Sequence, residues 1–225
     1  MPGFRIAVLA SGRGSNLAAL LRAIGDGRLP ASIVGVFSDK PGCGAIAIAR
    51  ERGLHAVALR PRDYADRAAH DEALFSAVGD VQPDLIVCAG YLRIITDTTV
   101  RRFEDRMINL HPSLLPRHPG LDTHARVLAA GEAEHGASVH AVIPALDAGP
   151  VLAQVRLDVG VGDTPESLAD RLSPREHALL VACTTAIAGG RARLAGGRWL
   201  FDGQALDQPL RLDALDQLQR ETAHA

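Results

Sequence analysis

The chain alternates short apolar runs with segments of helical periodicity, and this order constrains its fold more than any other feature. Phe4–Ala10 is a continuous β-favouring run, and a glycine-rich turn joins it to a helical pattern over Asn16–Ile24. The order recurs with apolar runs at 32–37, 55–59, 84–89 and 106–110 and helical patterns at 45–52, 68–78 and 98–103. Runs that are apolar on both faces are typical of buried parallel strands. We therefore expect an α/β fold with a doubly wound, mostly parallel, Rossmann-like sheet and helices on both faces.

The pattern changes after Pro116, where strands no longer alternate with helices. A short helix is expected at 123–130, after a loop that contains proline and glycine. Two alternating runs, 136–145 and 150–158, flank a turn at 146–150 and predict a C-terminal β-hairpin extension.

A long helical pattern then runs from Pro165 to about Ala188. Thr164 suits the N-cap of this helix and proline suits its first position. Pro174 should kink or interrupt it, because proline removes a backbone donor. A final short β element is expected at 191–201.

The last residues form a polar tail in which Leu212, Leu215 and Leu218 recur at helical spacing. This indicates a marginal docked helix or a frayed end. Because no low-complexity linker interrupts the chain, we expect one domain over 1–203, made of lobes at 1–110 and 111–203, followed by the tail at 204–225.

Composition excludes several classes of function. With 225 residues, 47% of them hydrophobic, the chain can bury an enzyme-sized core. A net charge of −2 provides no global field toward nucleic acid or a membrane surface, and 4% aromatic residues argue against a base-stacking platform. The expected partners are therefore small molecules, bound at local sites.

The cysteines argue for a reducing compartment. Cys43, Cys88 and Cys183 are odd in number and far apart, so neither a disulfide framework nor a zinc knuckle is indicated. No apolar stretch approaches membrane-spanning length, and the amino-terminal residues show no signal-type cleavage region. We expect a soluble, unprocessed cytoplasmic protein, either a monomer or a homodimer.

The stretch Met107–Pro116 carries the strongest chemical signal. An apolar run ends there on Asn109, His111 and two prolines, and the spacing of two places both polar side chains on one face of a strand. An amide and an imidazole at this spacing could stabilise an oxyanion and move a proton during acyl-type transfer. The alternative is that both side chains merely satisfy the end of a strand.

The turn Ser11–Leu17 joins the first strand to the first helix, where backbone N–H groups and the helix dipole favour an anion. It is not a dinucleotide fingerprint, because Leu17 stands in place of the third glycine, and the Walker lysine is absent. A monophosphate is the expected ligand. An ordinary glycine-containing turn is the alternative.

Asp147 lies in an Asp-Ala-Gly-Pro turn, from which its carboxylate could pair with His111 and favour the protonated imidazole. The alternative is an Asx-turn, in which the carboxylate bonds only its own backbone. Ser138 and His140 share one face of the following strand and could line a cleft, or His140 could be a satisfied, half-buried histidine.

The other familiar motifs are missing. Histidine is frequent, but no H-E-x-x-H, close helical pair or cysteine partner accompanies it, so we expect no metal. A serine hydrolase is disfavoured because G-x-S-x-G is absent.

Taken together, five blocks closely resemble the phosphoribosylglycinamide formyltransferase family of purine biosynthesis, in order from about residue 4 to residue 200. These blocks are Ser11–Leu17, Ala89–Ile94, Asn109–Pro116, Pro119–Gly120 and Glu134–Pro150. The resemblance implies transfer of a formyl group from 10-formyltetrahydrofolate to the glycine amine of glycinamide ribonucleotide. It also implies a phosphate-binding first lobe and a folate-binding, catalytic second lobe.

The same resemblance implies roles for individual residues. Asn109, His111 and Asp147 match the catalytic trio of the family. The implied substrate-binding residues are Gly14, Ser15, Asn16 and Glu176, and the implied folate-site residues are Arg67, Leu92, Arg93, Ile94, Ile95 and His140.

The chain departs from the family pattern at a few positions. Relatives often carry histidine at the position of Asp122 and lysine or an amide near Ser173, and Pro174 precedes the carboxylate expected to meet the substrate. Which cation supports the phosphate is therefore open, and Arg175 is a candidate by proximity alone.

Three rival functions remain at this point. Methionyl-tRNA formyltransferases share the N-x-H block but add a C-terminal RNA-binding domain, for which we expect no room after residue 200. Formyltetrahydrofolate deformylases share the core but carry an N-terminal regulatory module, whereas here the catalytic pattern starts at Phe4. A non-catalytic nucleotide-binding protein on the same fold is the third.

Overall fold

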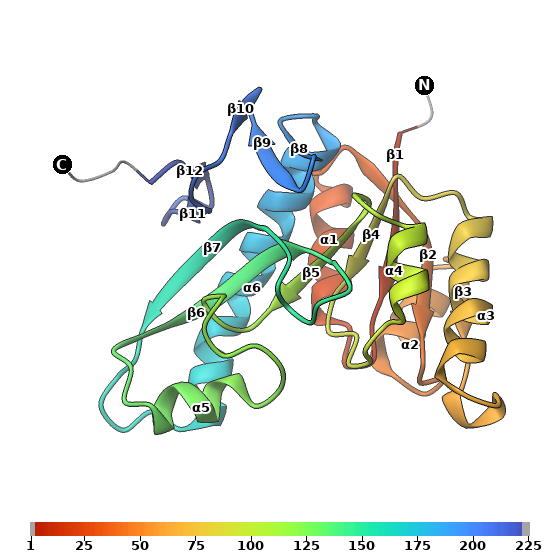
Figure 1. The fold of residues 1–225 in the computed structure, drawn as a ribbon, viewed down its shortest axis with the longest axis horizontal. Coiled ribbons are helices and arrows are strands. Elements are labelled where there is room, and N and C mark those ends of the chain that lie inside the picture. Colours follow the sequence, from red (N-terminus) through yellow and green to blue (C-terminus); the bar gives the residue numbers. More distant parts are fainter. Residues whose placement is uncertain (1–2, 222–225) are drawn as a thin grey trace. The chain divides into compact units, whose positions relative to one another are not determined.

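The computed structural model describes residues 3–221 and divides into two compact units. Unit 1 holds the chain up to Asn109 together with Val142–Pro144, and unit 2 holds Leu110–Ala141 and the chain from Ala145 onward. The α/β class, the mostly parallel sheet and the β-hairpin extension are confirmed (Figure 1).

Unit 1 is built on parallel strands in the order β5-β4-β1-β2-β3. The strands are β1 (Phe4–Leu9), β2 (Ala31–Ser38), β3 (Ala56–Ala58), β4 (Leu85–Cys88) and β5 (Met107–His111). The helices are α1 (Ser15–Gly25), α2 (Gly44–Glu51), the 3-10 turn η1 (Pro61–Asp63), α3 (Arg67–Asp80) and α4 (Asp97–Arg102). The first connection, from β1 through α1 to β2, therefore places a glycine turn at the carboxyl end of a central strand.

Burial on both faces explains why the strands of unit 1 read as unbroken apolar runs. Ala7 and Leu9 of β1 pack with Phe75 of α3 and Phe103 near α4 on one face, whereas α1 and α2 lie on the other (Figure 1). Residues of β1 that alternate with these, such as Ile6, are also fully buried. Full burial of a leucine or phenylalanine stabilises the fold by about 1.5–3 kcal/mol.

Unit 2 starts with α5 (Thr123–Ala129) and the antiparallel pair β6 (Glu134–Ala141) and β7 (Val151–Asp158). Helix α6 (Pro165–Ala188) packs on both strands. A capping box between Thr164 and Ser167 starts α6, as the Thr164 N-cap prediction required. The helix continues through Pro174, so the predicted interruption is wrong.

The residues after α6 form strands. The expected element at 191–201 is an antiparallel hairpin, β8 (Ala192–Ala195) with β9 (Arg198–Phe201), extended by β10 (Gln204–Ala205). In the tail, β11 (Leu210–Leu212) pairs in parallel with β7 and β12 (Leu218–Gln219) pairs with β11. The helical interpretation of the leucine spacing is therefore wrong for the described tail residues, because Leu210 and Leu212 alternate on a strand and are buried. Residues 222–225 of the predicted tail lie outside the described residues.

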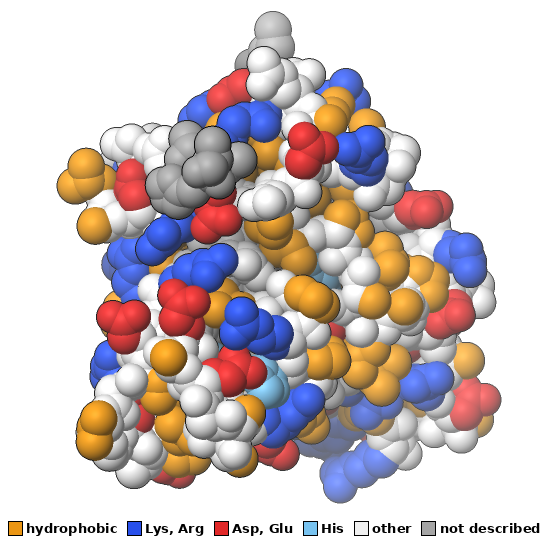
Figure 2. Space-filling model, turned by 60° about the vertical axis from the view of Figure 1, so that its left-hand side comes forward, with side chains coloured by type: hydrophobic (Ala, Val, Ile, Leu, Met, Phe, Trp, Pro, Cys, Tyr) orange, Lys and Arg blue, Asp and Glu red, His pale blue; other side chains and the backbone are white. Residues whose placement is uncertain are grey.

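The surface agrees with the near-zero net charge. On the face drawn in Figure 2, basic and acidic side chains are interspersed, with no broad area of one sign. No helix within residues 3–221 has the length and apolar character needed to cross a bilayer. Cys43, Cys88 and Cys183 are all buried free thiols.

Candidate active site

Strand β5 delivers Asn109 and His111 to one face, since they are two positions apart on a regular strand. Asn109 is partly buried and His111 is buried. The strand ends at His111, and the stiff segment Pro112–Pro116 follows it. The local conformation predicted from the Met107–Pro116 pattern is confirmed.

The His111 ring lies between two acceptor oxygens of unit 2. Its Nε2 is 3.0 Å from the carbonyl oxygen of His118, and its Nδ1 is 3.5 Å from Oδ2 of Asp147. An acceptor oxygen thus faces each ring nitrogen, and an imidazole with a proton on both nitrogens has a donor for each of them. The arrangement therefore suits a charged donor.

Asp147 is held much more firmly than a surface turn residue. Its side chain is only 9% exposed, and its Oδ2 accepts a hydrogen bond of 2.8 Å from the backbone N–H of Gly120. Its Oδ1 lies 3.7 Å from Nε2 of His140. The carboxylate thus lies between two imidazoles, and the pairing with His111 is present. The alternative, in which the carboxylate bonds only its own backbone, is wrong.

His140 joins this group from strand β6. Its ring meets the His111 ring edge-on at a centroid distance of 6.4 Å, and its Nδ1 is 2.9 Å from the carbonyl of Ala141. Burial is the main reason why the pKa of His140 lies below its usual value. A neutral His140 does not form an ion pair with the Asp147 carboxylate, so this carboxylate is available to His111.

Ser138, the partner of His140 on the same strand, has a structural role. It is fully buried, donates to the carbonyl of Ser113 at 2.7 Å and accepts from the N–H of Leu115 at 3.0 Å. It therefore fastens the segment after His111 to β6, and the hypothesis that it lines a cleft is wrong.

The turn between β1 and α1 has the predicted strand-turn-helix context. Gly14 has a φ of 85°, and a Cβ on it would lie 2.7 Å from Cα of Ala45, so only glycine fits. Ser15 and Asn16 form the first turn of α1, whose N-terminal N–H groups favour an anion. Oδ1 of Asn16 is buried with no hydrogen-bond partner among residues 3–221.

The segment after β4 carries apolar side chains on the outside of unit 1. Leu92 is 61% exposed and Ile94 is 53% exposed, whereas Ile95 packs against the core. Nε of Arg93 is buried and unpaired within the described chain, and Arg67 is exposed at the start of α3. Exposed leucine and isoleucine beside an unpaired guanidinium nitrogen suit a ligand with an aromatic body and a carboxylate.

Asp71 fixes this segment, and sequence reasoning did not find it. The side chain is fully buried on α3, and its Oδ2 accepts a hydrogen bond of 2.8 Å from the backbone N–H of Thr96. Its neighbour His70 is also fully buried, with Nε2 at 3.0 Å from the carbonyl of Leu59. The adjacent His70 and Asp71, two polar residues inside an apolar helical pattern, were the sequence signal that could have indicated this role.

Glu176 lies half-buried on α6, and burial raises its pKa to about 7. Arg175, the candidate cation for the phosphate, is already engaged in unit 2. Its guanidinium is 2.7 Å from Oδ1 of Asp216 and 2.7 Å from the carbonyl of Asp213. The structure therefore gives Arg175 a partner in the tail and does not support the phosphate interpretation.

We expect the Michaelis constant for an amide- or amine-bearing substrate to fall as pH rises through about 7, because only ionised Glu176 is a pure acceptor. Glu176→Gln should flatten this dependence. The same variant should be more stable than the parent protein above pH 7, since folding raises this pKa and the charged form opposes folding there. Steady-state kinetics between pH 6 and 8 measure the first effect, and thermal melting between pH 4 and 8 measures the second, because the stability difference builds up as pH rises from 4.5 to about 7. An unchanged pH dependence of KM in Glu176→Gln would assign it to another group.

Comparisons with known proteins agree with this geometry. Residues 4–184 match the formyl transferase family. The chain is 42% identical to phosphoribosylglycinamide formyltransferase of Mycobacterium tuberculosis (strain H37Rv), over 82% of this chain and 85% of that one. It is 36% identical to the Escherichia coli (strain K12) enzyme of the same name, over 89% and 95%. The chain belongs to the phosphoribosylglycinamide formyltransferase family.

A solved structure extends the match to the fold of this formyltransferase. The phosphoribosylglycinamide formyltransferase of Coxiella burnetii superposes with a TM-score of 0.86 at 37% identity, covering 91% of this chain and 96% of the other. The high coverage on both sides confirms that the chain is a formyl transferase enzyme.

Asp122, a position at which the chain departs from the expected family pattern, is the exposed residue before α5 and has a φ of 57°. Its side chain makes no capping hydrogen bond. We expect Asp122→His to change kcat and KM less than about tenfold, because histidine tolerates this backbone conformation and the side chain holds no catalytic partner. A thousandfold change in kcat/KM would show that Asp122 belongs to the catalytic machinery.

Proposed function

We propose that this formyltransferase moves the formyl group of 10-formyltetrahydrofolate to the amine of N1-(5-phosphoribosyl)glycinamide, a step of de novo purine biosynthesis. The observation that carries the proposal is the pairing of His111 with Asp147 beside Asn109 in a member of this family. Asn109, His111 and Asp147 are the proposed catalytic residues.

The neutral amine attacks the formyl carbon, so a C–N bond forms and the carbonyl electron pair moves to oxygen. The amide N–H of Asn109 and Nε2–H of protonated His111 stabilise this oxyanion, which would replace the His118 carbonyl as the acceptor for Nε2. Asp147 holds the imidazolium and receives the amine proton through a water molecule. Collapse of the intermediate breaks the bond to the folate nitrogen, which takes up the proton from Asp147 through the water molecule and leaves as tetrahydrofolate.

Substrate binding is assigned to residues of each unit. Gly14, Ser15 and Asn16 offer backbone donors at the start of α1 to the ribonucleotide phosphate, and Glu176 accepts from the glycinamide end. For the folate, Arg67 and Arg93 offer cations, and Leu92 and Ile94 offer exposed apolar surface, with Ile95 behind them and His140 beside the catalytic pair. The unpaired Nε of Arg93 supports a carboxylate-bearing ligand.

We also infer a cytoplasmic location from three buried free thiols, which suit a reducing compartment. A monomer or homodimer stays the expected assembly. The chemistry proposed for Asn109, His111 and Asp147 uses donors and a base and draws on no metal. No group of three or more potential metal ligands occurs within residues 3–221.

The test is to mix the purified protein with both substrates and follow tetrahydrofolate. We expect formyl transfer to depend on the ribonucleotide phosphate. The KM of the dephosphorylated substrate should be higher by at least about a hundredfold, because two or more charge-assisted hydrogen bonds are lost. Ser15→Ala, which keeps the backbone N–H but removes a hydroxyl donor beside it, should raise KM for the phosphorylated substrate only. Equal turnover of both substrates at low concentration would overturn the assignment of the loop, and release of formate without the acceptor would instead indicate a deformylase.

A further inference from the structure

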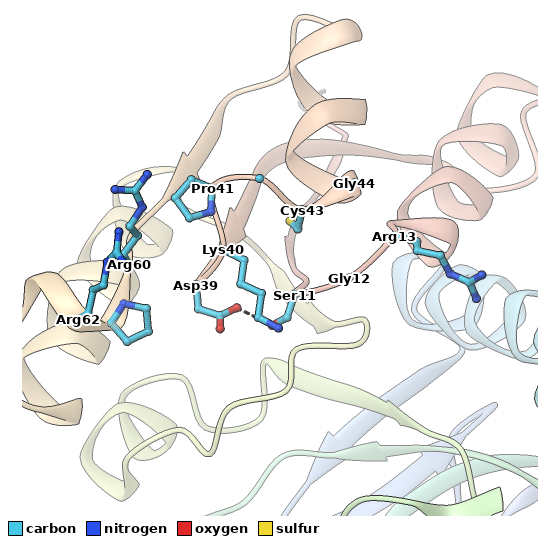
Figure 3. A pocket seen from close by; sticks show the side chains of 12 residues that line it. Ser11, Gly12, Arg13, Asp39, Lys40, Pro41, Cys43, Gly44, Arg60 and Arg62 are labelled. Atoms are coloured by element: carbon cyan, nitrogen blue, oxygen red, sulfur yellow. Dashed lines mark hydrogen bonds between the residues drawn. The ribbon is translucent and has the colours of Figure 1, made fainter. Parts of the chain in front are cut away.

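A cavity of about 890 Å3 opens in unit 1 at the carboxyl ends of β1, β2 and β3 (Figure 3). Three segments line it, one after each strand: residues 11–13, 39–44 and 60–62. Gly14, Ser15 and Asn16 do not line the cavity, which adjoins the proposed phosphate loop through residues 11–13 of the same turn. Its volume falls in the range of about 300–1,000 Å3 that small-molecule sites occupy.

Cations dominate the side chains of this cavity. Arg60 and Arg62 lie together at one wall, and Lys40 lies beside Ser11 and Asp39 (Figure 3). Within residues 3–221, neither Lys40 nor Arg60 has a carboxylate at ion-pair distance, and Arg62 has only Asp63 at 3.9 Å. Three cations with so few carboxylates beside them favour an anionic ligand.

Asp39 restricts which anion fits. It follows β2 directly, is 6% exposed, and accepts a hydrogen bond of 2.6 Å on Oδ1 from Oγ of Ser11. Oγ of Ser11 in turn accepts from the N–H of Leu92 at 3.1 Å, so the carboxylate is fixed in place. A fixed carboxylate repels a bare polyanion but accepts hydrogen bonds from hydroxyl groups, so the ligand should carry both hydroxyls and negative charge.

The topology places Asp39 where a nucleotide ribose binds in sheets of this order. An acidic residue at the end of the second strand, about 20 residues after the glycine turn, holds the ribose hydroxyl in such folds. Asp39 follows Gly14 by 25 positions, and β2 lies next to β1. The rings of Pro41 and Pro61 add flat apolar surface to the cavity, which suits the face of a base.

We propose that this cavity binds a nucleoside di- or triphosphate. Asp39 accepts from the ribose hydroxyls, Lys40, Arg60 and Arg62 hold the phosphates, and the prolines contact the base. The proposal does not rest on the formyl-transfer assignment.

Lys40 gives a direct readout, because it is the only lysine of the chain. Acylation with an N-hydroxysuccinimide ester, followed by peptide mass spectrometry, measures the accessibility of its amine, and the α-amine serves as the internal control. We expect ATP to slow acylation of Lys40 and not of the α-amine. Adenosine, which lacks the phosphates, should protect much less.

Matched ligands separate a nucleotide site from a general anion patch. Calorimetry should give saturable ATP binding, with weaker binding of 2′,3′-dideoxy-ATP, inorganic triphosphate and a γ-linked triglutamate. Absence of protection and of binding at millimolar ATP would overturn the proposal. Equal affinity for triphosphate or triglutamate would also overturn it, because the ribose contact to Asp39 would then be absent.

Arg60→Ala combined with Arg62→Ala should weaken ATP binding by about tenfold, through loss of two phosphate contacts. Arg50→Ala combined with Arg52→Ala removes two exposed cations of the neighbouring helix region that do not line the cavity, and should leave ATP binding unchanged. ATP should still bind in the presence of saturating glycinamide ribonucleotide. Competition between the two would place ATP in the substrate site and overturn the proposal, whatever the outcome of the formyl-transfer assay.

Discussion

Asp147→Asn should leave the protein folded and lower kcat by at least about a hundredfold, the lower end of general acid–base contributions. The carboxylate lies 3.5 Å from Nδ1 of His111, and an amide there neither stabilises the imidazolium nor accepts the amine proton. The loss should appear in kcat, with KM for the ribonucleotide nearly unchanged. Steady-state kinetics with both substrates measure it.

The structure also makes this substitution a fair test. An asparagine oxygen can still accept the hydrogen bond from Gly120, so the melting temperature should change little even though the side chain is nearly buried. Asp105→Asn, at another aspartate with a positive φ but an exposed side chain, is the matched control and should keep full activity. A folded Asp147→Asn enzyme with normal kcat would exclude Asp147 as the base and leave it a structural turn residue.

Asn109→Ala should lower kcat by about a hundred- to a thousandfold, or roughly 2.7–4 kcal/mol in the barrier, the cost of removing one oxyanion donor. Asn109→Asp keeps the shape of the side chain but replaces N–H donors with a negative charge. It should therefore be at least as impaired as Asn109→Ala.

The pair of variants distinguishes an oxyanion donor from a packing residue. If Asn109 serves only to fill space at the end of β5, the near-isosteric aspartate should retain far more activity than alanine. Gln204→Ala, which removes an exposed amide in β10, should behave like the parent enzyme. Melting curves should accompany the kinetics. If Asn109→Ala proves much less stable than the parent enzyme, the kcat of Asn109→Asp is compared with that of the parent instead.

Local rules in the sequence determined the class of the fold and most of its elements. The apolar runs of unit 1 predicted buried parallel strands because their residues are apolar on both faces, and β1, β2 and β4 are buried on both faces. The N-cap at Thr164 and the glycine turn at Gly14 were also readable, since each rests on the backbone preference of one or two residues. The spacing of Asn109 and His111 fixed their common face.

Tertiary contacts decided what local rules left open. In the tail, leucines spaced for a helix became strands, because pairing of β11 with β7 outweighed a weak helical preference. Asp147 had two interpretations as a turn residue, of which turn chemistry alone favoured the Asx-turn. Only the approach of Gly120, His111 and His140 from distant segments made it a nearly buried carboxylate.

The same limit explains the residues that sequence reasoning missed or misplaced. Sequence reasoning did not separate Asp71 from the other polar residues of its helix, but in the structure it accepts a hydrogen bond from the N–H of Thr96. Arg175 was a candidate for the phosphate, but in the structure it pairs with Asp216 of the tail. In each case the deciding partner lies at least 25 positions away along the chain, a separation that local periodicity does not report. The sequence by itself determined most of the elements, the family and the chemical types at the site. Only the tertiary structure decided which of those side chains are buried together, because burial and pairing depend on contacts between remote segments.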